Sequence, residues 1–191
     1  MRAASLSVIS LALAAGAWSV VNSVVGAQGR TDPNIVMLDN CSPADPAYDG
    51  FGGCPEGAGP GSASYTGNVS VDEFFSLLFS PLAPADHVIG HPSWRNEPSY
   101  LTVRAGRTVR VTNRGGRAHT FTEVADFGGG FVPPLNGAMA PAPECGANFT
   151  PDPSVEFLAR GESQELTVGG PGLHKFQCCI HPWMRGAIRV E

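Results

Sequence analysis

The alternation of apolar and polar residues in the second half of the chain constrains its fold more than any other feature. From residue 99 the segments SYLTV and RTVRVTN carry an apolar residue at every second position, with a turn between them at residues 105–106. Successive side chains of a strand point to opposite faces, so such a segment buries one face. The inward positions are Leu101, Val103, Val109 and Val111. The runs HTFTEV, VEFLA, QELTV, LHKFQC and GAIRV follow, and strands at this spacing predict an all-β sandwich.

One segment ahead of these strands has the period of a helix. In SVDEFFSLLF, residues 70–79, the apolar residues recur at i, i+3, i+4, i+7 and i+8, which is one helical face. Ser70 followed by Glu73 fits a capping box at the start of that helix. The segment therefore predicts a short amphipathic helix that lies on the core, with a strand as the alternative.

The first 27 residues have the pattern of an export signal. Arg2 precedes the apolar run LSVISLALAAGAWSVV, and small or apolar residues stand at Val25 and Ala27. This pattern predicts a signal peptide cleaved after Ala27, and a secreted, periplasmic or cell-envelope location. An uncleaved membrane anchor is the alternative, because the run approaches the roughly 20 residues needed to span a bilayer. Residues 28–69 then form a polar, turn-rich extension with no obvious regular element, and residues 70–191 form the sandwich domain.

The charge of the chain argues against one class of partner. The chain has 12 basic and 17 acidic residues, and the basic residues form no stripe in the sequence. Domains that bind nucleic acid usually carry such a stripe, so we expect no nucleic acid partner. No general base, nucleophile or open substrate site stands out, so we do not expect the chain alone to be an enzyme.

The five cysteines all follow the predicted signal. In an exported chain an odd number suggests two disulfides and one free thiol. Cys41 and Cys54 lie in the polar extension and could close a small loop there. Cys145 lies in residues 125–153, a segment rich in Gly and Pro that interrupts the strand pattern. An irregular segment of that length in a compact domain is usually functional or disordered.

The run FQCCIHPWM, residues 176–184, brings a thiol, an imidazole and a thioether together. If Cys178 is the thiolate, then Cys178, His181 and Met184 follow a Cys-x2-His-x2-Met spacing that fits one tight loop between two strands. A soft, redox-active metal favours thiolate and imidazole ligands, with a long and weak thioether bond. A fourth ligand must come from another strand, and His119 in RAHTFTEV is the natural candidate.

With these residues the chain resembles the cupredoxin (blue copper) family, and most of all its amicyanin and plastocyanin branch. The family has a histidine after a strand that ends in Asn, and an aromatic-x-Cys-x2-His-x2-Met run before the last strand. VTNRGGRAH and FQCCIHPWM match these features, and the resemblance covers roughly residues 97–191. It implies a Greek-key β-sandwich that holds one type 1 copper ion through His119, Cys178, His181 and Met184.

The sequence departs from the family pattern in three ways. Thr120 stands where many members carry an Asn that ties the two ligand loops together, although a Thr hydroxyl can still form a hydrogen bond. Cys179, beside the expected ligand, and the long segment at 125–153 are additions. With Phe176 and Cys178 on the inward strand face, Cys179 points outward and is free to pair.

The four cysteines other than Cys178 allow three pairings. We favour Cys41–Cys54 and Cys145–Cys179, which would anchor the long segment beside the ligand loop. Because that segment cannot bury much core of its own, we expect it to be mobile between its ends and to shield one flank of the site. A Cys178–Cys179 disulfide without metal is the alternative, and it leaves the two histidines unexplained.

The other histidines are interpreted as structural. His87 and His91 have a metal-like i, i+4 spacing, but Gly90 and Pro92 break a helix there. His174 shares the strand of Cys178 but lies roughly 13 Å away along it.

The resemblance implies a one-electron carrier whose electrons leave through the exposed edge of His181. A redox partner protein would dock on an apolar patch near His181 and Trp183. The rival class is copper storage, delivery or sensing in the cell envelope, because the same ligands could hold Cu(I) without electron traffic.

Overall fold

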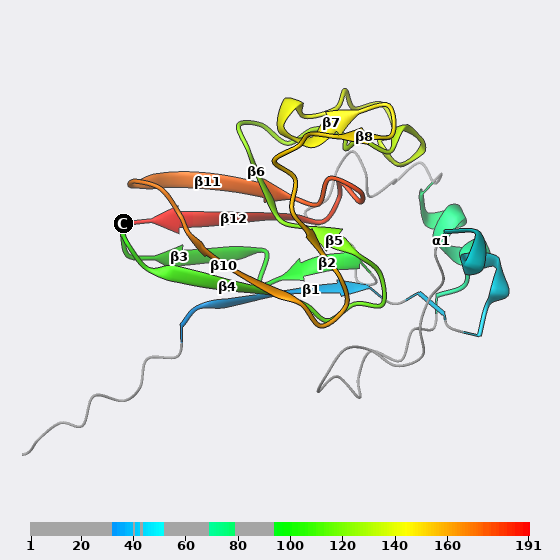
Figure 1. Cartoon of the computed structure of the whole chain (residues 1–191), viewed down its shortest axis with the longest axis horizontal. Helices are drawn as coiled ribbons and strands as arrows, with labels where there is room; N and C mark the ends of the chain where they lie inside the picture. The colour runs from blue at the N-terminus through cyan, green and yellow to red at the C-terminus, as the bar shows by residue number, and fades with distance from the viewer. Residues whose placement is uncertain (1–31, 40, 43, 52–68, 79–93) are drawn as a thin grey trace, which may run out of the picture. The chain divides into compact units, whose positions relative to one another are not determined.

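The computed structural model describes residues 32–39, 41–42, 44–51, 69–78 and 94–191. This part of the chain forms two four-stranded sheets, two short strand pairs and one α-helix. The two sheets share one cluster of buried apolar residues, and Figure 1 shows their strands as the central body. The all-β sandwich predicted from the alternating segments is therefore confirmed.

The first sheet has the order β10-β4-β1-β2. Its strands are β1 (Asn34–Asp39), β2 (Trp94–Glu97), β4 (Thr108–Asn113) and β10 (Ser163–Thr167). β1 pairs antiparallel with β2 and parallel with β4. Just past β4, the Arg114 N–H donates to the Met37 carbonyl at 2.9 Å. This pairing carries the end of β1 to the turn that leads from β4 to His119.

The second sheet has the order β3-β12-β11-β6. Its strands are β3 (Tyr100–Val103), β6 (Thr122–Val124), β11 (Gly172–Gln177) and β12 (Arg185–Val190). β12 pairs antiparallel with β11 and parallel with β3. Two short pairs complete the strands: β5 (His119–Thr120) with β9 (Phe157–Leu158), and β7 (Gly146–Ala147) with β8 (Thr150–Pro151).

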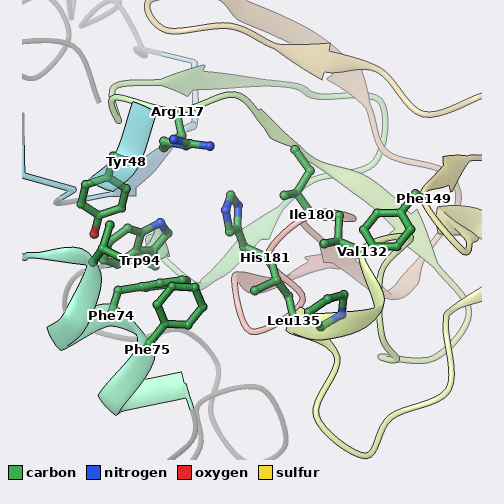
Figure 2. A pocket seen from close by; sticks show the side chains of 12 residues that line it. Tyr48, Phe74, Phe75, Trp94, Arg117, Val132, Leu135, Phe149, Ile180 and His181 are labelled. Atoms are coloured by element: carbon green, nitrogen blue, oxygen red, sulfur yellow. The ribbon is translucent and has the colours of Figure 1, made fainter. Parts of the chain in front are cut away.

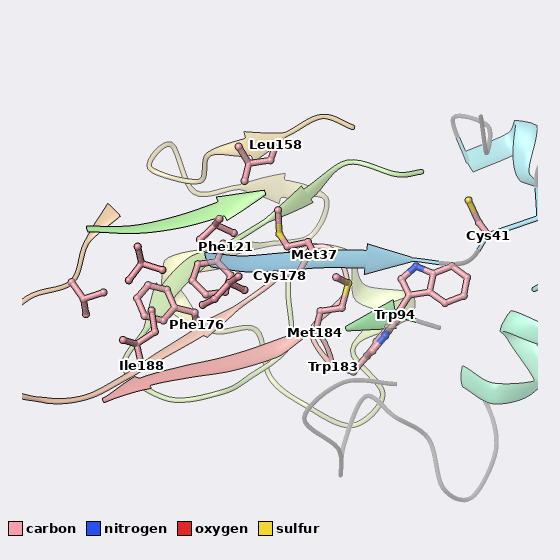
Figure 3. Packing of buried hydrophobic residues seen from close by; sticks show 14 of the residues in the cluster. Met37, Cys41, Trp94, Phe121, Leu158, Phe176, Cys178, Trp183, Met184 and Ile188 are labelled. Atoms are coloured by element: carbon pink, nitrogen blue, oxygen red, sulfur yellow. The ribbon is translucent and has the colours of Figure 1, made fainter. Parts of the chain in front are cut away.

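Apolar side chains from both sheets fill the space between them (Figure 3). Phe121 stacks on Phe176 with the ring centroids 4.6 Å apart. Three of the predicted inward positions, Val103, Val109 and Val111, are buried, and Leu101 packs half-buried against the same cluster. Complete burial of one such side chain contributes roughly 1.5–3 kcal/mol to folding. The period-two pattern therefore identified the core face correctly.

β1 corrects the expectation that residues 28–69 contain no regular element. NIVMLD forms an inner strand of the first sheet, with Ile35, Met37 and Leu38 all buried. A 3₁₀ helix, η1 (Pro46–Phe51), follows it. The sandwich therefore begins well before residue 70, because its first sheet depends on a strand from the segment interpreted as an extension.

The predicted helix is present as α1 (Val71–Leu78). The Glu73 N–H donates to the Ser70 Oγ at 3.1 Å, which is the first half of the expected capping box. On the apolar face, the Phe74 ring lies 4.8 Å from that of Trp94 and 5.9 Å from that of Trp183. The strand alternative is therefore wrong, and the helix packs on the core as predicted; Phe79 lies outside the described residues.

The long segment at 125–153 is folded and attached along its length. It contains the 3₁₀ helices η2 (Pro133–Leu135) and η3 (Pro143–Cys145) as well as β7 and β8. The predicted Cys145–Cys179 disulfide is confirmed. The segment also has a small core, whose members are Val124, Ala142, Cys145, Val155 and Cys179. The expectation of a segment held only at its ends is therefore wrong. Small buried side chains and the disulfide give the segment a core, which could not be inferred from its content of Gly and Pro.

Several predictions fall outside the described residues. They concern the signal or anchor at residues 1–27, Cys54 in the Cys41–Cys54 pair, and the histidines His87 and His91. Among the described residues, no helix combines the length and apolar character needed to cross a membrane. His174, the third histidine interpreted as structural, lies against Glu123 (2.6 Å) and the Gly170 carbonyl (2.8 Å).

Candidate metal centre

Three of the predicted ligands converge at one end of the sandwich. His119 begins β5, Cys178 directly follows β11, and His181 lies in the loop between β11 and β12. Cys178 Sγ lies 3.8 Å from His119 Nδ1 and 3.7 Å from His181 Nδ1, and the two Nδ1 atoms are 3.2 Å apart. This group could hold one metal ion.

The spacing of the three donor atoms fits a trigonal metal site. Bonds of about 2.0 Å to nitrogen and about 2.3 Å to sulfur, at 120° to each other, place the donors about 3.5–3.7 Å apart. The observed separations of 3.2–3.8 Å bracket that range. Both histidines present Nδ1, so the two rings approach the common point in the same manner.

The Cys178 sulfur lies in a dry environment that nevertheless favours the thiolate. Cys178 and His119 are fully buried, and His181 is 7% exposed. Burial alone raises the pKa of the thiol, but hydrogen bonds and the charges of His119 and His181 lower the pKa well below its ordinary value. The backbone N–H groups of Thr120 (3.4 Å) and His181 (3.5 Å) also point at the sulfur. The chain thus provides a buried sulfur whose surroundings favour the thiolate, which is the form that binds metal.

Asp39 contacts the side of the His119 ring that faces away from the other two donors. The sequence analysis did not identify this residue. Its Oδ2 lies 2.8 Å from His119 Nε2, and both side chains are almost fully buried. The Gly116 and Arg117 N–H groups each donate to the carboxylate at 2.9 Å. Burial raises the pKa of Asp39, but the His119 hydrogen bond, the charge of His119 and the two amides together lower it to about 2.

An ionised Asp39 fixes the tautomer of His119. A carboxylate can only accept, so Nε2 of the imidazole carries the proton and donates to Asp39. Nδ1 faces Cys178 and His181, and it becomes a free donor once a bound metal displaces its proton. Burial lowers the pKa of His119, but the hydrogen bonds to Asp39 and Cys178 outweigh burial and raise the pKa to about 9 in the metal-free chain. Carboxylate–histidine–metal chains of this kind orient the ligand ring.

Gly115 allows the carboxylate to lie where it does. A Cβ atom added at this position would collide with the side chain of Asp39. The glycine pair before His119 is therefore a site of close approach as well as a turn. The sequence signal for Asp39 was the short apolar run IVML directly before it, which ends in a carboxylate.

Thr120 links the two ligand-bearing segments. The Cys179 N–H donates to the Thr120 Oγ1 at 2.8 Å, while the Thr120 N–H points at the Cys178 sulfur. The hydroxyl therefore ties the segments together, as expected for a residue in place of the usual Asn. It does so beside Cys179, which the disulfide also fixes.

Met184 and Trp183 lie at the far end of the ligand loop, and both are buried. The Cys178 N–H donates to the Met184 carbonyl and the Met184 N–H to the His181 carbonyl, at 3.0 and 2.8 Å. These bonds close a tight loop, and the Met184 side chain belongs to the buried cluster of Figure 3 together with Cys178. The Trp183 side chain is only 1% exposed and packs beside His181, so it offers no surface of its own.

An apolar pocket adjoins His181 (Figure 2). Its volume is about 360 Å³, and its wall combines parts of the chain that are distant in sequence. Phe74 and Phe75 of α1 contribute on one side, and Val132, Leu135 and Phe149 of the long segment on another. The expectation that this segment lies beside one flank of the site is met at these residues.

No family model and no curated protein matches the chain. Its structure is similar to that of a purple cupredoxin from Nitrosopumilus maritimus, at 16% identity and a TM-score of 0.40, over 84% of this chain and 100% of that one. A reduced amicyanin variant is 25% identical over 59% of this chain and 92% of its own, with a TM-score of 0.35. A copper-containing nitrite reductase from Thermus scotoductus is 25% identical over 51% of this chain and 20% of its own, with a TM-score of 0.33. The metal assignment rests on the geometry of the three donor atoms.

Proposed function

We propose that the chain is an exported cupredoxin that binds one copper ion and carries single electrons. The observation that carries the proposal is the buried convergence of one thiolate and two imidazole Nδ1 atoms, with separations of 3.2–3.8 Å. A Cys-His₂ plane with a weak thioether is the donor set that type 1 copper uses. Cys178, His119 and His181 would hold the ion, and Met184 would supply the weak thioether donor.

Copper in such a centre supplies exchange of one electron between Cu(II) and Cu(I). The residues of the chain hold the donors still while this happens. Asp39 anchors the His119 ring, Thr120 joins the two ligand segments, and the disulfide fixes the backbone next to Cys178. Burial of the three donors excludes water from their common point. A site so constrained changes little between the two oxidation states, which favours rapid transfer.

The direct test is the absorption spectrum of the full-length chain after addition of Cu(II). We expect an intense thiolate-to-copper band in the wild type and its loss in Cys178→Ser, because the thiolate is the source of that band. Cys179→Ser is the matched control, since it replaces the neighbouring cysteine and should keep the band. A colourless Cys179→Ser together with a coloured Cys178→Ser would show that the ligand assignment is wrong.

Electron transfer would use the His181 edge, because His181 alone among the three donors is partly exposed. We propose that a redox partner protein approaches this edge and that the chain works in the periplasm or outside the cell. Trp183 does not take part in the surface, since its side chain is buried.

Copper storage, delivery or sensing is the second candidate, and the depth of the centre favours it. Two donor residues are fully buried, and one face of His181 opens into a pocket instead of a flat surface. Electron self-exchange and copper release to a chelator separate the two functions. A carrier exchanges electrons quickly and releases copper slowly, whereas a delivery protein shows the reverse.

A further inference from the structure

The pocket beside His181 has the size and lining of a small-molecule site. Its volume of about 360 Å³ falls in the range of roughly 300–1,000 Å³ that such sites occupy. Aromatic and aliphatic side chains make up most of the wall, with few polar groups among them. A void of about 150 Å³ already accommodates benzene, so this pocket has room for one or two rings.

One buried donor in the pocket wall has no acceptor. Trp94 is 3% exposed, and its Nε1 finds no hydrogen-bond partner among the residues that the structure describes. Figure 2 shows the indole nitrogen on the edge of Trp94 that faces His181. The hydroxyl of Tyr48, which also lies in the wall, is used, since it donates to the Val69 carbonyl at 2.9 Å. A buried N–H without a partner is uncommon and calls for an explanation.

The rim of the pocket is held in an unfavourable backbone conformation. Asn148 and Phe149 are consecutive non-glycine residues with φ of 50° and 62°. A positive φ is a genuine outlier for a bulky residue such as Phe. The Phe149 N–H donates to the Phe131 carbonyl at 2.6 Å, and the Phe149 side chain remains 67% exposed. The two residues form the two-residue turn between β7 and β8, a turn type that requires positive φ at both positions, and this turn carries the apolar ring of Phe149 to the pocket wall.

We propose that this pocket binds a small aromatic molecule that carries one acceptor oxygen, such as an aromatic ketone or ether. The rings lie between Phe74 and Leu135, and the oxygen accepts the Trp94 Nε1–H. Phe149 covers the rings from the rim. The ligand would lie against the exposed edge of His181 and so compete with any protein that approaches there. Binding does not require the metal, so the inference stands apart from the proposed electron transfer.

The test compares two probes that differ only in the oxygen. Tetralone is a two-ring ketone, and tetralin has the same rings without the carbonyl. Each is titrated into the full-length chain as purified, and binding is followed by calorimetry and by the fluorescence of the tryptophans. We expect one saturable site, with tetralone bound roughly tenfold more tightly than tetralin, because one hydrogen bond to a buried, otherwise unpaired donor is gained.

Three variants and one control locate the site. Trp94→Phe keeps an aromatic ring but removes the N–H, and we expect the two probes to bind it equally. Leu135→Trp fills the pocket and should weaken both probes at least tenfold. Phe149→Ala should weaken both probes several-fold, whereas Phe157→Ala, at an exposed phenylalanine outside the pocket wall, should leave binding unchanged.

Two results would overturn the proposal. The first is the absence of saturable binding of either probe by the wild type, which would show that the pocket is not a site for small aromatic molecules. The second is a preference for tetralone that persists in Trp94→Phe. Both results are read from binding alone, so they are distinct from a failure of the chain to take up copper or to transfer electrons.

Discussion

The Asp39 carboxylate lies outside the donor set but acts on the centre through its hydrogen bond to His119. It is buried, ionised and hydrogen-bonded to the far side of the His119 ring. A fixed negative charge behind a ligand stabilises Cu(II) relative to Cu(I). It also holds the tautomer that leaves Nδ1 available for the metal.

Neutralising this charge is expected to raise the reduction potential. Asp39→Asn keeps an acceptor oxygen for His119 but removes the negative charge, so Cu(II) loses stabilisation. At an effective dielectric of about 20, a charge at this range shifts the potential by tens of millivolts, up to about 100 mV. Spectroelectrochemistry of the copper-loaded protein measures the shift. Asp126→Asn is the control, because this carboxylate is exposed, and an equal shift in both variants would contradict the argument.

The role of Met184 as a weak ligand can be tested by substitution. Met184→Leu should leave copper bound by the remaining three donors and should raise the reduction potential, because a weak donor that favours Cu(II) is lost. Met37→Leu is a matched control, since Met37 is equally buried but belongs to β1. Complete loss of copper from Met184→Leu, measured by metal analysis, would mean that the residue is not a weak axial ligand.

At the residue scale, the sequence predicted the three donors of one local motif and, through the family resemblance, the distant His119, but it missed Asp39. The spacing of Cys178, His181 and Met184 is local, so the motif itself carries the information. Asp39 contacts His119 across 80 residues of sequence. That contact exists only because β1 pairs parallel with β4, a pairing that no local pattern encodes.

At the element scale, the Cys145–Cys179 disulfide joins the long segment to the residue next to the ligand Cys178. The Phe131 N–H also donates to the Cys179 carbonyl at 3.0 Å. An added Cβ at Gly130 would collide with that same carbonyl, so the segment packs directly on the ligand loop. The long segment therefore supports the centre mechanically although it supplies no donor.

Removing this disulfide should destabilise the fold more than it alters the copper site. The double variant Cys145→Ala with Cys179→Ala opens a loop closed across 34 residues. The chain-entropy model predicts a loss of about 3–4 kcal/mol in the free energy of unfolding. Denaturant unfolding of the metal-free chain measures this loss, while the thiolate-to-copper band should persist. An unchanged free energy of unfolding would indicate that the small core of the segment suffices without the disulfide.

The elements differ in how well the sequence predicted them. β4, β11 and β12 are long enough to show alternation, and α1 shows the helical period over two turns. β1 has the same length of six residues, but it lies next to turn-rich sequence and its last three residues are all buried, so its alternation is obscured. The folding of residues 125–153 could not be read from a composition rich in Gly and Pro, because its core is made by a disulfide and by small side chains.

At the scale of the whole molecule, the folding equilibrium should depend on the ionisation of Asp39. Its pKa falls from 3.8 to about 2 on folding, so its contribution is present above pH 3.8 and is lost as the pH falls toward 2. The contribution is on the order of 2 kcal/mol. We therefore expect the free energy of unfolding of the metal-free chain to fall more steeply between about pH 4 and pH 2 in the wild type than in Asp39→Asn. Parallel curves for the two proteins would contradict this assignment.

The sequence separations between the residues of the centre also determine when the centre can form during folding. Asp39 and His119 are 80 residues apart, and His119 and Cys178 are 59 apart. Contacts between residues so far apart in sequence form slowly, because the entropy cost of closing a long loop comes before the stabilisation that the contact provides. β12, which holds the ligand loop from its far side, follows all the donors along the chain. A growing chain therefore has no complete centre until its last strand is made and paired, and metal capture should be a late event in its biogenesis.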